Sequence, residues 1–214
     1  MDIIGPIEPS ASNGHRFILV VIDYFTKWVE TTSNKSVTKK FMDDFVKNNM
    51  ICRFGVPKSI ITDNGANLNS HLMKEIRVQF KITHRNSTAY QPQINGAIKA
   101  ANKNIKKIMR KMIDNYRNWH KQLPYALLGY RTMTHTSTKT TLYLLVYGTE
   151  VVIPIEIEIP SLRIIKEVKL QDAEWARNRD EQVAMIEEKR MVAVCHRQLY
   201  RQRMSRAFNK RVRT

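Results

Sequence analysis

Two aspartates in the first third of the chain, Asp2 and Asp63, are side chains of the kind that bind divalent metal ions. Asp2 lies in a short apolar stretch, and Asp63 directly follows another one, Ser59–Thr62. Carboxylates on separate elements can hold two Mg²⁺ ions about 3.5–4 Å apart, so that the metals stabilise both reacting oxygens of a phosphodiester. Alone, both residues are weak indicators, because Asp-Asn-Gly at 63–65 is a common turn and Asp2 is close to a terminus.

The elements around these aspartates predict one mixed sheet. Three apolar stretches separated by turn residues are typical of an antiparallel meander and lie at residues 2–7, 16–24 and 27–31. Helices are expected over 41–50, ending at Gly55 and Pro57, and over 72–80, with strands over 59–62 and 81–84. The order βββαβαβ predicts an α/β fold, a five-stranded sheet flanked by helices. In such a sheet Asp2, Asp63 and the start of the next helix converge at one edge.

That next helix is expected to begin near Asn95, after a loop over 86–94, and it is strongly basic. Residues 93–111 contain six Lys and Arg and no carboxylate. Lys99, Lys103, Lys106 and Arg110 are spaced by four, three and four residues, which places them on one helix face. Such a face suits contacts with phosphates, although a solvated helix surface has the same pattern. A further helix is expected near Asn118, broken or kinked at Pro124.

The overall charge points to a polyanionic partner. The chain has 36 Lys and Arg against 19 Asp and Glu, a net charge of +17. Nucleic acid is the simplest partner for this balance, whereas no basic helix with a bulky apolar face indicates a membrane surface. Neither a signal peptide nor a membrane span is indicated, which predicts a protein of the nucleus or cytoplasm. Cys52 and Cys195 have no metal-binding spacing and are expected to be free thiols.

The C-terminal third has a different character. From Asp172 to Arg213 there is no Pro or Gly, and from Lys189 onward nine Lys and Arg occur without an acidic residue. This pattern predicts one long, mostly exposed basic helix, packed through Trp175, Val183 and Ile186. We therefore expect a core over 1–154, a linker over 155–171 and a basic helical extension over 172–214.

Several motifs, in order and with matching spacing, resemble those of a known family: "VVIDYFTKWVE", "RFGVPKSIITDNGANL", "TAYQPQINGAI" and "LLVYGTE". The chain resembles the integrase core of a gypsy-like long-terminal-repeat retrotransposon, related to retroviral integrases, from Met1 to about Pro154. The resemblance implies a ribonuclease H-like fold and a D,D(35)E triad that binds Mg²⁺ or Mn²⁺. It implies two reactions for DNA integration, 3′-end processing and strand transfer, and a core that can form homo-oligomers.

The resemblance implies that Asp2 and Asp63 are the first two catalytic, metal-binding acids. The third acid belongs at position 99, and this chain has Lys99 there. An ammonium cannot ligate Mg²⁺ and repels it, so metal binding is expected to be weakened and catalysis impaired. Lys139 and Leu142 also replace the Gly and Pro of the family pattern, which is typical of a decaying copy.

The resemblance also implies a DNA surface. Residues that match Asn102, Lys103 and Lys106 line the surface that meets DNA ends in the family, and Arg110 continues their basic row. Tyr90, Gln93 and Asn95 match the loop beside the active site.

Three functions remain open from the sequence. The first is an integrase core that catalyses strand transfer. The second is an inactive, non-sequence-specific DNA-binding module derived from a retrotransposon, which Lys99 and the net charge favour. The third is a ribonuclease H-like nuclease, against which the loop with Pro92-Gln93 and Asn95-Gly96 argues.

Overall fold

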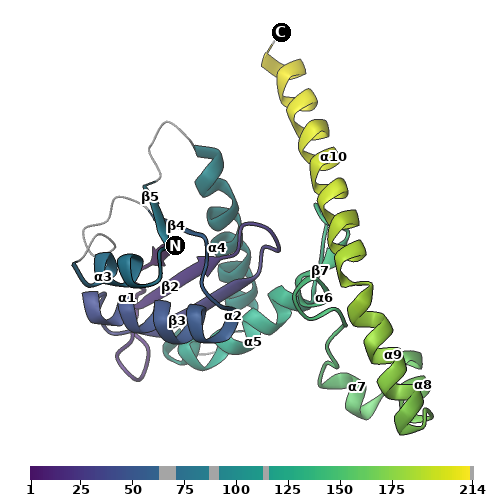
Figure 1. The fold of residues 1–214 in the computed structure, drawn as a ribbon. Coiled ribbons are helices and arrows are strands. Elements are labelled where there is room, and N and C mark those ends of the chain that lie inside the picture. The colour runs from purple at the N-terminus through teal and green to yellow at the C-terminus, as the bar shows by residue number, and fades with distance from the viewer. Residues whose placement is uncertain (63–70, 87–91, 113–115, 213–214) are drawn as a thin grey trace. The chain divides into compact units, whose positions relative to one another are not determined.

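The computed structural model describes residues 1–62, 71–86, 92–112 and 116–212 (Figure 1). The chain divides into two compact units, Met1–Tyr130 and Arg131–Thr214. This division does not test the predicted domain boundaries at residues 154 and 171, and they remain a prediction. The two units are described separately below.

A three-stranded antiparallel sheet lies at the centre of the first unit, with the order β1-β2-β3. Its strands are β1 (Asp2–Ile4), β2 (Phe17–Ile22) and β3 (Val29–Asn34). The central strand is apolar throughout, as expected for a strand covered on both faces. The turn into β3 is held by Asp23, whose carboxylate accepts hydrogen bonds from the Thr26 backbone N–H at 2.6 Å and from its hydroxyl at 2.7 Å. The predicted meander is confirmed.

A second, parallel pair of strands follows the helical segment that the sequence predicted. That segment consists of α1 (Lys39–Phe45), a π-helical stretch (Val46–Ile51) and α2 (Cys52–Phe54). It ends at Gly55, whose φ of 83° lies in a region that other residues rarely adopt. β4 (Ser59–Thr62) then pairs with β5 (Thr83–Asn86), and α3 (His71–Gln79) connects the two.

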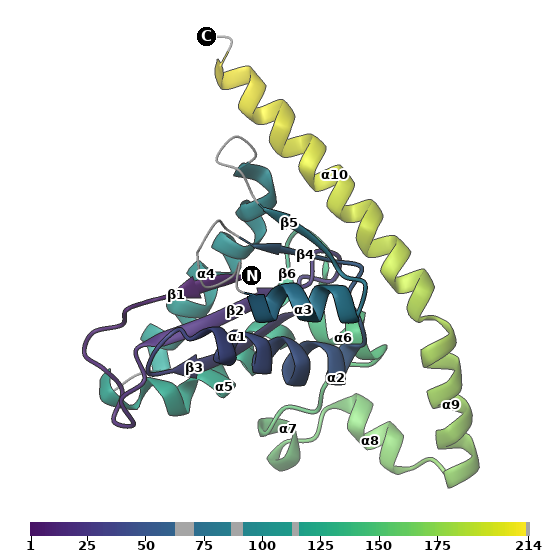
Figure 2. The same ribbon diagram turned by 60° about the vertical axis from the view of Figure 1, so that its left-hand side comes forward.

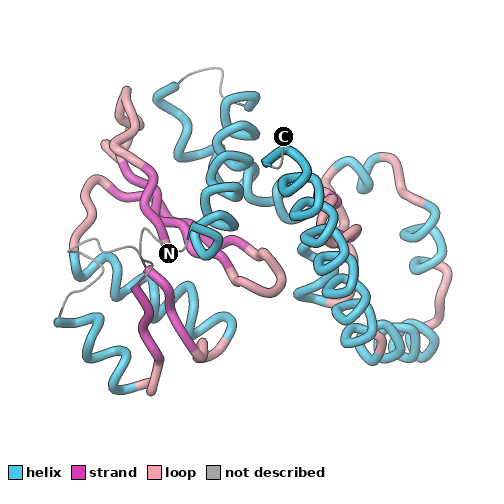
Figure 3. Tube along the Cα trace, turned by 90° about the horizontal axis from the view of Figure 1, so that it is seen from above, coloured by secondary structure: helices cyan, strands magenta, loops and turns pink. Residues whose placement is uncertain are grey.

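The described strands do not form the single five-stranded sheet that was predicted. They form three separate ladders, of which β1-β2-β3 and β4-β5 belong to the first unit (Figure 3). One hydrogen bond, from the Met1 ammonium to the Ile61 carbonyl oxygen at 2.7 Å, joins the start of β1 to β4. Among the described residues, β1 and β4 belong to different ladders.

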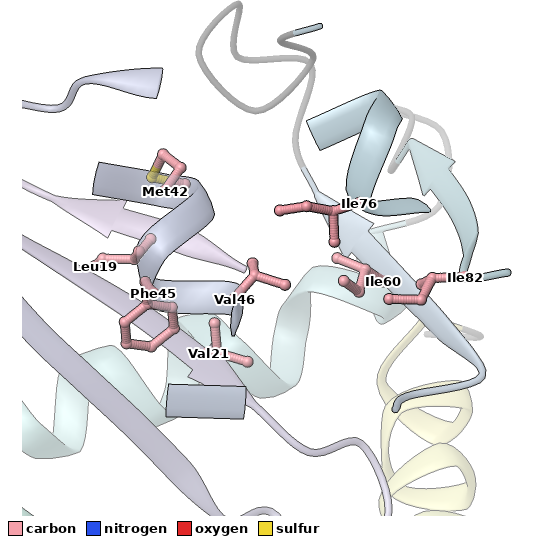
Figure 4. Close-up of a cluster of buried hydrophobic side chains, with 8 residues drawn as sticks. All are labelled: Leu19, Val21, Met42, Phe45, Val46, Ile60, Ile76 and Ile82. Carbon is pink, nitrogen blue, oxygen red and sulfur yellow. The ribbon is translucent and has the colours of Figure 1, made fainter. Parts of the chain in front are cut away.

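The core of this unit lies between the strands and the helices α1 and α3. Figure 4 shows the cluster, in which Phe45 and Val46 face Leu19 and Val21 of β2, while Ile60, Ile76 and Ile82 extend it to β4 and α3. Burying one such side chain stabilises the fold by about 1.5–3 kcal/mol. This cluster fixes β4, and therefore the strand end that precedes Asp63, relative to β2.

Two helices cover the other face of β2. α4 (Pro92–Met112) packs against β2 through buried residues that recur at helical spacing, Ile98, Ala101, Ile105 and Met109. It begins three residues before the predicted start, inside the predicted loop, because Pro92 is compatible with the first turn of a helix. α5 (Trp119–Thr132) follows a 3₁₀ turn (Tyr116–Asn118) and continues through Pro124, where a break or kink was predicted.

The second unit contains a small β-ladder and five helices within the described residues. The ladder pairs β6 (Thr134–His135) with β7 (Thr140–Thr141). The helices are α6 (Leu142–Tyr147), α7 (Ile155–Glu158), α8 (Leu162–Val168), α9 (Asp172–Ala184) and α10 (Ile186–Val212). None of the helices in the described part of the chain combines the length and apolar character needed to span a membrane.

The C-terminal segment is helical, as predicted, but it is two helices rather than one. α9 ends at Ala184, Met185 is its C-cap, and α10 begins at Ile186 (Figure 2). Two of the three residues expected to pack the segment are largely exposed, Trp175 at 51% and Val183 at 49%. Of the three, only Ile186 packs closely on another segment. Its side chain lies against Gly148, where an added Cβ atom would be 3.2 Å from the Ile186 Cδ1 atom.

Candidate active site and nucleic-acid interface

Asp2 lies on β1 opposite Val20 of β2, next to the point where β1 meets β4. Its Oδ1 atom accepts a hydrogen bond from the Ile3 backbone N–H at 2.9 Å. The bond from Met1 to Ile61 brings this residue beside the end of β4, which is Thr62. Asp63, the next residue, lies outside the described residues, so the distance between the two aspartates stays open.

The side chain of Asn102 on α4 also contacts Asp2. The Asn102 amide group donates a hydrogen bond from Nδ2 to Asp2 Oδ2 at 2.8 Å, across one hundred residues of chain. Asn102 is only 8% exposed, although the sequence predicted that it would contact DNA. The structure therefore shows Asn102 holding the carboxylate of Asp2, a role that the sequence did not indicate because it depends on how α4 packs.

This hydrogen bond also locates Lys99. Residues three apart on a helix are neighbours, with their Cβ atoms about 5–6 Å apart, so Lys99 stands one turn before Asn102 on the side of α4 that meets Asp2. The Lys99 side chain is exposed. Helix geometry therefore places position 99, to which the resemblance assigned the third acid, on the same side of α4 as Asn102. Its role as the third acid position remains a prediction.

The described residues alone do not supply the ligands of a pair of metal ions. Asp2 is the only carboxylate that the described residues bring to this place, and they contain no group of three metal-binding side chains. The Oδ1 atom of Asn102 is buried and has no hydrogen-bond partner among the described residues, so it could offer one further oxygen. A protonated Lys99 supplies no lone pair for a metal ion.

The end of β4 is fixed by a pair that the sequence did not single out. The Thr62 hydroxyl group and the His84 Nε2 atom are 2.7 Å apart and form a hydrogen bond between β4 and β5. Burial lowers the pKa of His84, and the positive charges of Arg77 and the N-terminus lower it further. The neutral ring therefore holds the residue that precedes Asp63. The sequence offered no signal for this pair beyond one histidine in a strand.

The predicted basic row is confirmed as one exposed face of α4. Lys99, Lys103, Lys106 and Arg110 are all exposed, while Ile98, Ile105 and Met109 are buried against the sheet. The four cations follow the helix for about three turns, starting at the Asp2 site. Because α4 has no acidic residue, nothing on this helix neutralises them. Such a row can contact successive phosphates of a nucleic-acid backbone.

Three other predicted site residues cannot be placed in full. Tyr90 lies outside the described residues. Gln93 and Asn95 lie in the first turn of α4, and their side chains are outside the described part of the structure. Their predicted contacts with DNA remain predictions.

A comparison with protein families finds a match in the N-terminal part of the chain. Residues 1–92 match the family model described as "Integrase core domain". Among curated proteins, the Gag-Pol polyprotein of Woolly monkey sarcoma virus is 31% identical over 137 residues, 63% of this chain and 8% of that protein. The chain therefore spans less than a tenth of that relative.

Two solved structures show the same fold. One is the simian T-cell lymphotropic virus intasome in complex with PP2A regulatory subunit B56 gamma, with a TM-score of 0.55, 22% identity, and coverage of 67% of this chain and 51% of that chain. The other is the HTLV-2 integrase catalytic core domain in complex with magnesium, in a trimeric form. Its TM-score is 0.53 at 20% identity, with coverage of 66% and 90%. The predicted resemblance to a retroviral-type integrase core is confirmed, and the narrower likeness to gypsy-like elements remains a prediction.

Proposed function

Since residues 1–92 match the integrase core domain of retroviral-type Pol proteins, we propose that this chain is a DNA-binding core for DNA integration whose own catalytic site is incomplete. In this proposal the core binds DNA ends along α4, and Lys99 prevents 3′-end processing and strand transfer. The inactive binding module is thus favoured over the active enzyme.

The observation that carries the proposal is the hydrogen bond from Asn102 to Asp2. It supports the assignment of position 99 to the third acid of the triad, because it brings the first turns of α4 to the first aspartate. A cation about 4 Å from another unit positive charge costs about 4 kcal/mol at an effective dielectric constant near 20. The ammonium of Lys99 would therefore oppose a second metal ion as well as failing to ligate it.

The residues of this chain would act as a binding surface in the following way. Lys103, Lys106 and Arg110 contact backbone phosphates and supply affinity without sequence preference. Lys99 adds a fourth cation at the end of the row, where the family has a carboxylate. Asn102 holds Asp2 in place, and His84 with Thr62 holds the strand end before Asp63. When bound, Mg²⁺ or Mn²⁺ would supply Lewis-acid stabilisation of the reacting oxygens.

The same proposal includes a finer account of the fold. A ribonuclease H-like core would have one sheet in the order β3-β2-β1-β4-β5, in which β1 and β4 are neighbours. The Met1–Ile61 hydrogen bond and the cluster around Ile60 support this order. The core would extend to residue 154, followed by a linker and the basic extension from residue 172. Homo-oligomers through the core, and a nuclear or cytoplasmic location, are further parts of the prediction.

Strand-transfer assays test the function directly. Purified natural protein and the Lys99→Glu variant are compared with labelled DNA ends, a target plasmid, and Mg²⁺ or Mn²⁺. We expect the natural protein to bind the DNA ends without joining them, and the variant to gain metal-dependent joining. A parallel assay with an RNA–DNA hybrid measures nuclease activity. Strand transfer by the natural protein would refute the proposal, and so would failure to bind duplex DNA.

A further inference from the structure

One stretch of this basic chain is acidic and apolar. Between Lys139 and Arg163 there is no Lys or Arg, and the stretch contains the carboxylates of Glu150, Glu156 and Glu158. No other stretch of the chain runs as far without a basic residue, although the net charge is +17. It lies in the second unit and includes α6 and α7. Its composition therefore sets it apart from the surfaces that suit a polyanion.

Large apolar side chains are exposed along the second half of this stretch. Ile157 is 76% exposed, Ile159 72% and Leu162 77%. Single exposed apolar residues are ordinary, but several so close together in the chain are typical of an interaction site. Glu158, between two of the isoleucines, is exposed as well. We call these residues the acidic–apolar patch: Val152, Ile155, Ile157, Glu158, Ile159 and Leu162.

Arg163 holds the patch in a defined shape. Its guanidinium group donates a hydrogen bond to the Val151 carbonyl oxygen at 3.3 Å and lies 3.7 Å from the Glu156 carboxylate. The Glu156 carboxylate also accepts a hydrogen bond from the Ile153 backbone N–H at 3.0 Å. These contacts connect α8 to α7 and to the residues before it. The patch is therefore presented by a folded segment with its own internal contacts.

α10 of the same unit carries a surface of opposite charge. The packed side of this helix is marked by Arg190, which donates a hydrogen bond to the Leu145 carbonyl oxygen at 2.9 Å, and by Ala193, which is 5% exposed. Another side carries exposed residues at intervals of seven, four and three positions, which is the spacing of one helix face. From Lys189 to the end of α10 there is no carboxylate. We call the exposed residues of this side the basic strip: Val192, Leu199, Arg203 and Arg206.

The basic strip leads away from the patch of its own chain. Gly148, the C-cap of α6, lies against Ile186 in the first turn of α10. Because an α-helix rises about 1.5 Å per residue, Leu199 and Arg206 are about 20 and 30 Å beyond that contact. Figures 1 and 2 both show this half of α10 leading away from α7 and α8. The strip is therefore available to another molecule.

Charge indicates which molecule fits the patch. Nucleic acid and acidic membrane surfaces would be repelled by the carboxylates of this stretch. Two identical patches would bring Glu158 of both copies together, and two identical strips would bring arginines together. A patch and a strip are complementary in charge, and both have exposed apolar side chains to bury. The partner that fits the patch is therefore a basic helix with exposed apolar residues.

We propose that the acidic–apolar patch of one chain binds the basic strip of α10 from a second copy. The isoleucines of the patch pack on Leu199, and Glu158 pairs with Arg203 or Arg206. When each copy offers its strip to the other, the two contacts are identical and close a symmetric dimer. This interface differs from an oligomer formed through the core, because one of its sides is α10. It is also independent of the Asp2 site and of the function proposed above.

Sedimentation velocity of the full chain over a range of concentrations tests this interface, after nuclease treatment has removed bound nucleic acid. The natural chain should dimerise. A patch variant, Ile157→Lys with Glu158→Lys, and a strip variant, Arg203→Glu with Arg206→Glu, should each dimerise at least about tenfold more weakly, because like charges would meet. An equimolar mixture of the two variants should regain the dimer. In the mixture the altered patch meets the altered strip and the natural patch meets the natural strip, so both contacts join opposite charges.

Lys39→Glu with Lys40→Glu is the matched control, because it makes the same change in net charge as the strip variant on exposed residues of the first unit. It should leave dimerisation unchanged. A natural chain that stays monomeric would overturn the proposal, and so would a patch or strip variant that dimerises as strongly as the natural chain. A mixture that stays monomeric, with both variants folded by circular dichroism, would overturn it too. Failure of the natural chain to bind duplex DNA counts against the function of the core and has no bearing on this interface.

Discussion

At the scale of single residues, the proposed function depends on Lys99. Asp2 is held by Asn102 and Ile3 in a fixed orientation, so a Lys in place of a third carboxylate, as proposed, would leave the contacts of Asp2 intact. The substitution therefore changes the charge and the ligand set while the helix that carries it still packs on the sheet through Ile98 and Ala101. A change at this position alone should act on metal binding.

We expect Lys99→Glu to raise the affinity for Mg²⁺ or Mn²⁺, measured by titration calorimetry. The variant removes a positive charge and adds an oxygen ligand, and both effects favour a divalent cation. Asp63→Asn in the Lys99→Glu background should cancel the gain, since both acids would be needed for a pair of metals. Equal metal affinities for the natural chain and Lys99→Glu, with both folded, would show that position 99 is not the third ligand.

A second residue predicts how stability depends on pH. Asp43 of α1 is 4% exposed, and its Oδ1 atom has no hydrogen-bond partner among the described residues. Burial raises the pKa of Asp43 above its ordinary value of 3.8, the charges of Asp44 and Glu75 raise it further, and Lys47 opposes them. The folded state therefore keeps this proton to a higher pH than the unfolded state does. Stability contributed by the neutral carboxyl is present below pH 3.8 and is lost as pH rises through the raised pKa.

We therefore expect Asp43→Asn to stabilise the protein at neutral pH and not in acid. Removing the negative charge that burial disfavours should be worth about 1 kcal/mol, or a rise in Tm of about 2–4 °C for a chain of this size. Thermal melts followed by circular dichroism at several pH values measure the difference. Asp44→Asn is the control, because Asp44 is the exposed neighbour. A gain of the same size at every pH would exclude this explanation.

At the scale of elements, α4 connects the site to the binding surface. One side of α4 packs on β2, the border of that side carries Asn102 against Asp2, and the exposed side next to this border carries the basic row. Contact with DNA along this helix would therefore begin at the active-site end.

Removing two members of the basic row should weaken duplex binding. Lys103→Gln with Lys106→Gln should lower the affinity at low salt for all sequences alike, and reduce the magnitude of the slope of log K against log salt by about 2. Lys39→Gln with Lys40→Gln gives a matched control, since both residues are exposed on α1, which packs against the opposite face of β2. Equal effects of the two double variants would show that net charge, rather than α4, determines binding.

Local patterns in the sequence were sufficient to predict most helices and strands of the first unit. The alternating apolar stretches predicted the meander, and Gly55 marked the end of the helical segment before β4. The break at Met185 could not be predicted, because no Pro or Gly marks it and the start of α10 is fixed by the contacts of Ile186 and Arg190 with residues 145–148. The role of Asn102 could not be predicted either, because it depends on a contact with Asp2, which is far away in the sequence. The triad positions come from the resemblance and remain a prediction, whereas the contact that holds Asp2 became visible only in the packing of α4.

At the scale of the whole molecule, the charge is shared by both units. Met1–Tyr130 has 20 basic and 9 acidic residues, or +11, and Arg131–Thr214 has 16 and 10, or +6. The positive charge therefore does not depend on the C-terminal extension alone. Such a balance favours rapid, sequence-independent association with nucleic acid.

We expect the whole chain to bind duplex DNA with little sequence preference and strong dependence on salt. With roughly six phosphate contacts, the slope of log K against log salt should be about −5. Filter binding or anisotropy over a series of salt concentrations, with two unrelated duplexes, measures both properties. Binding that is insensitive to salt, or a clear preference for one duplex, would contradict this expectation.

The hydrogen bond between Asn102 and Asp2 has a genetic consequence. Codons for Lys and Glu differ only in their first base, A in place of G, so a point mutation is enough to exchange the two residues at position 99. Because Asn102 binds Asp2, a carboxylate introduced at position 99 would stand on a helix that already contacts Asp2. If position 99 is the third acid position, as we propose, one base change could therefore restore the acid, whereas a deletion or a frameshift could not be reversed so simply.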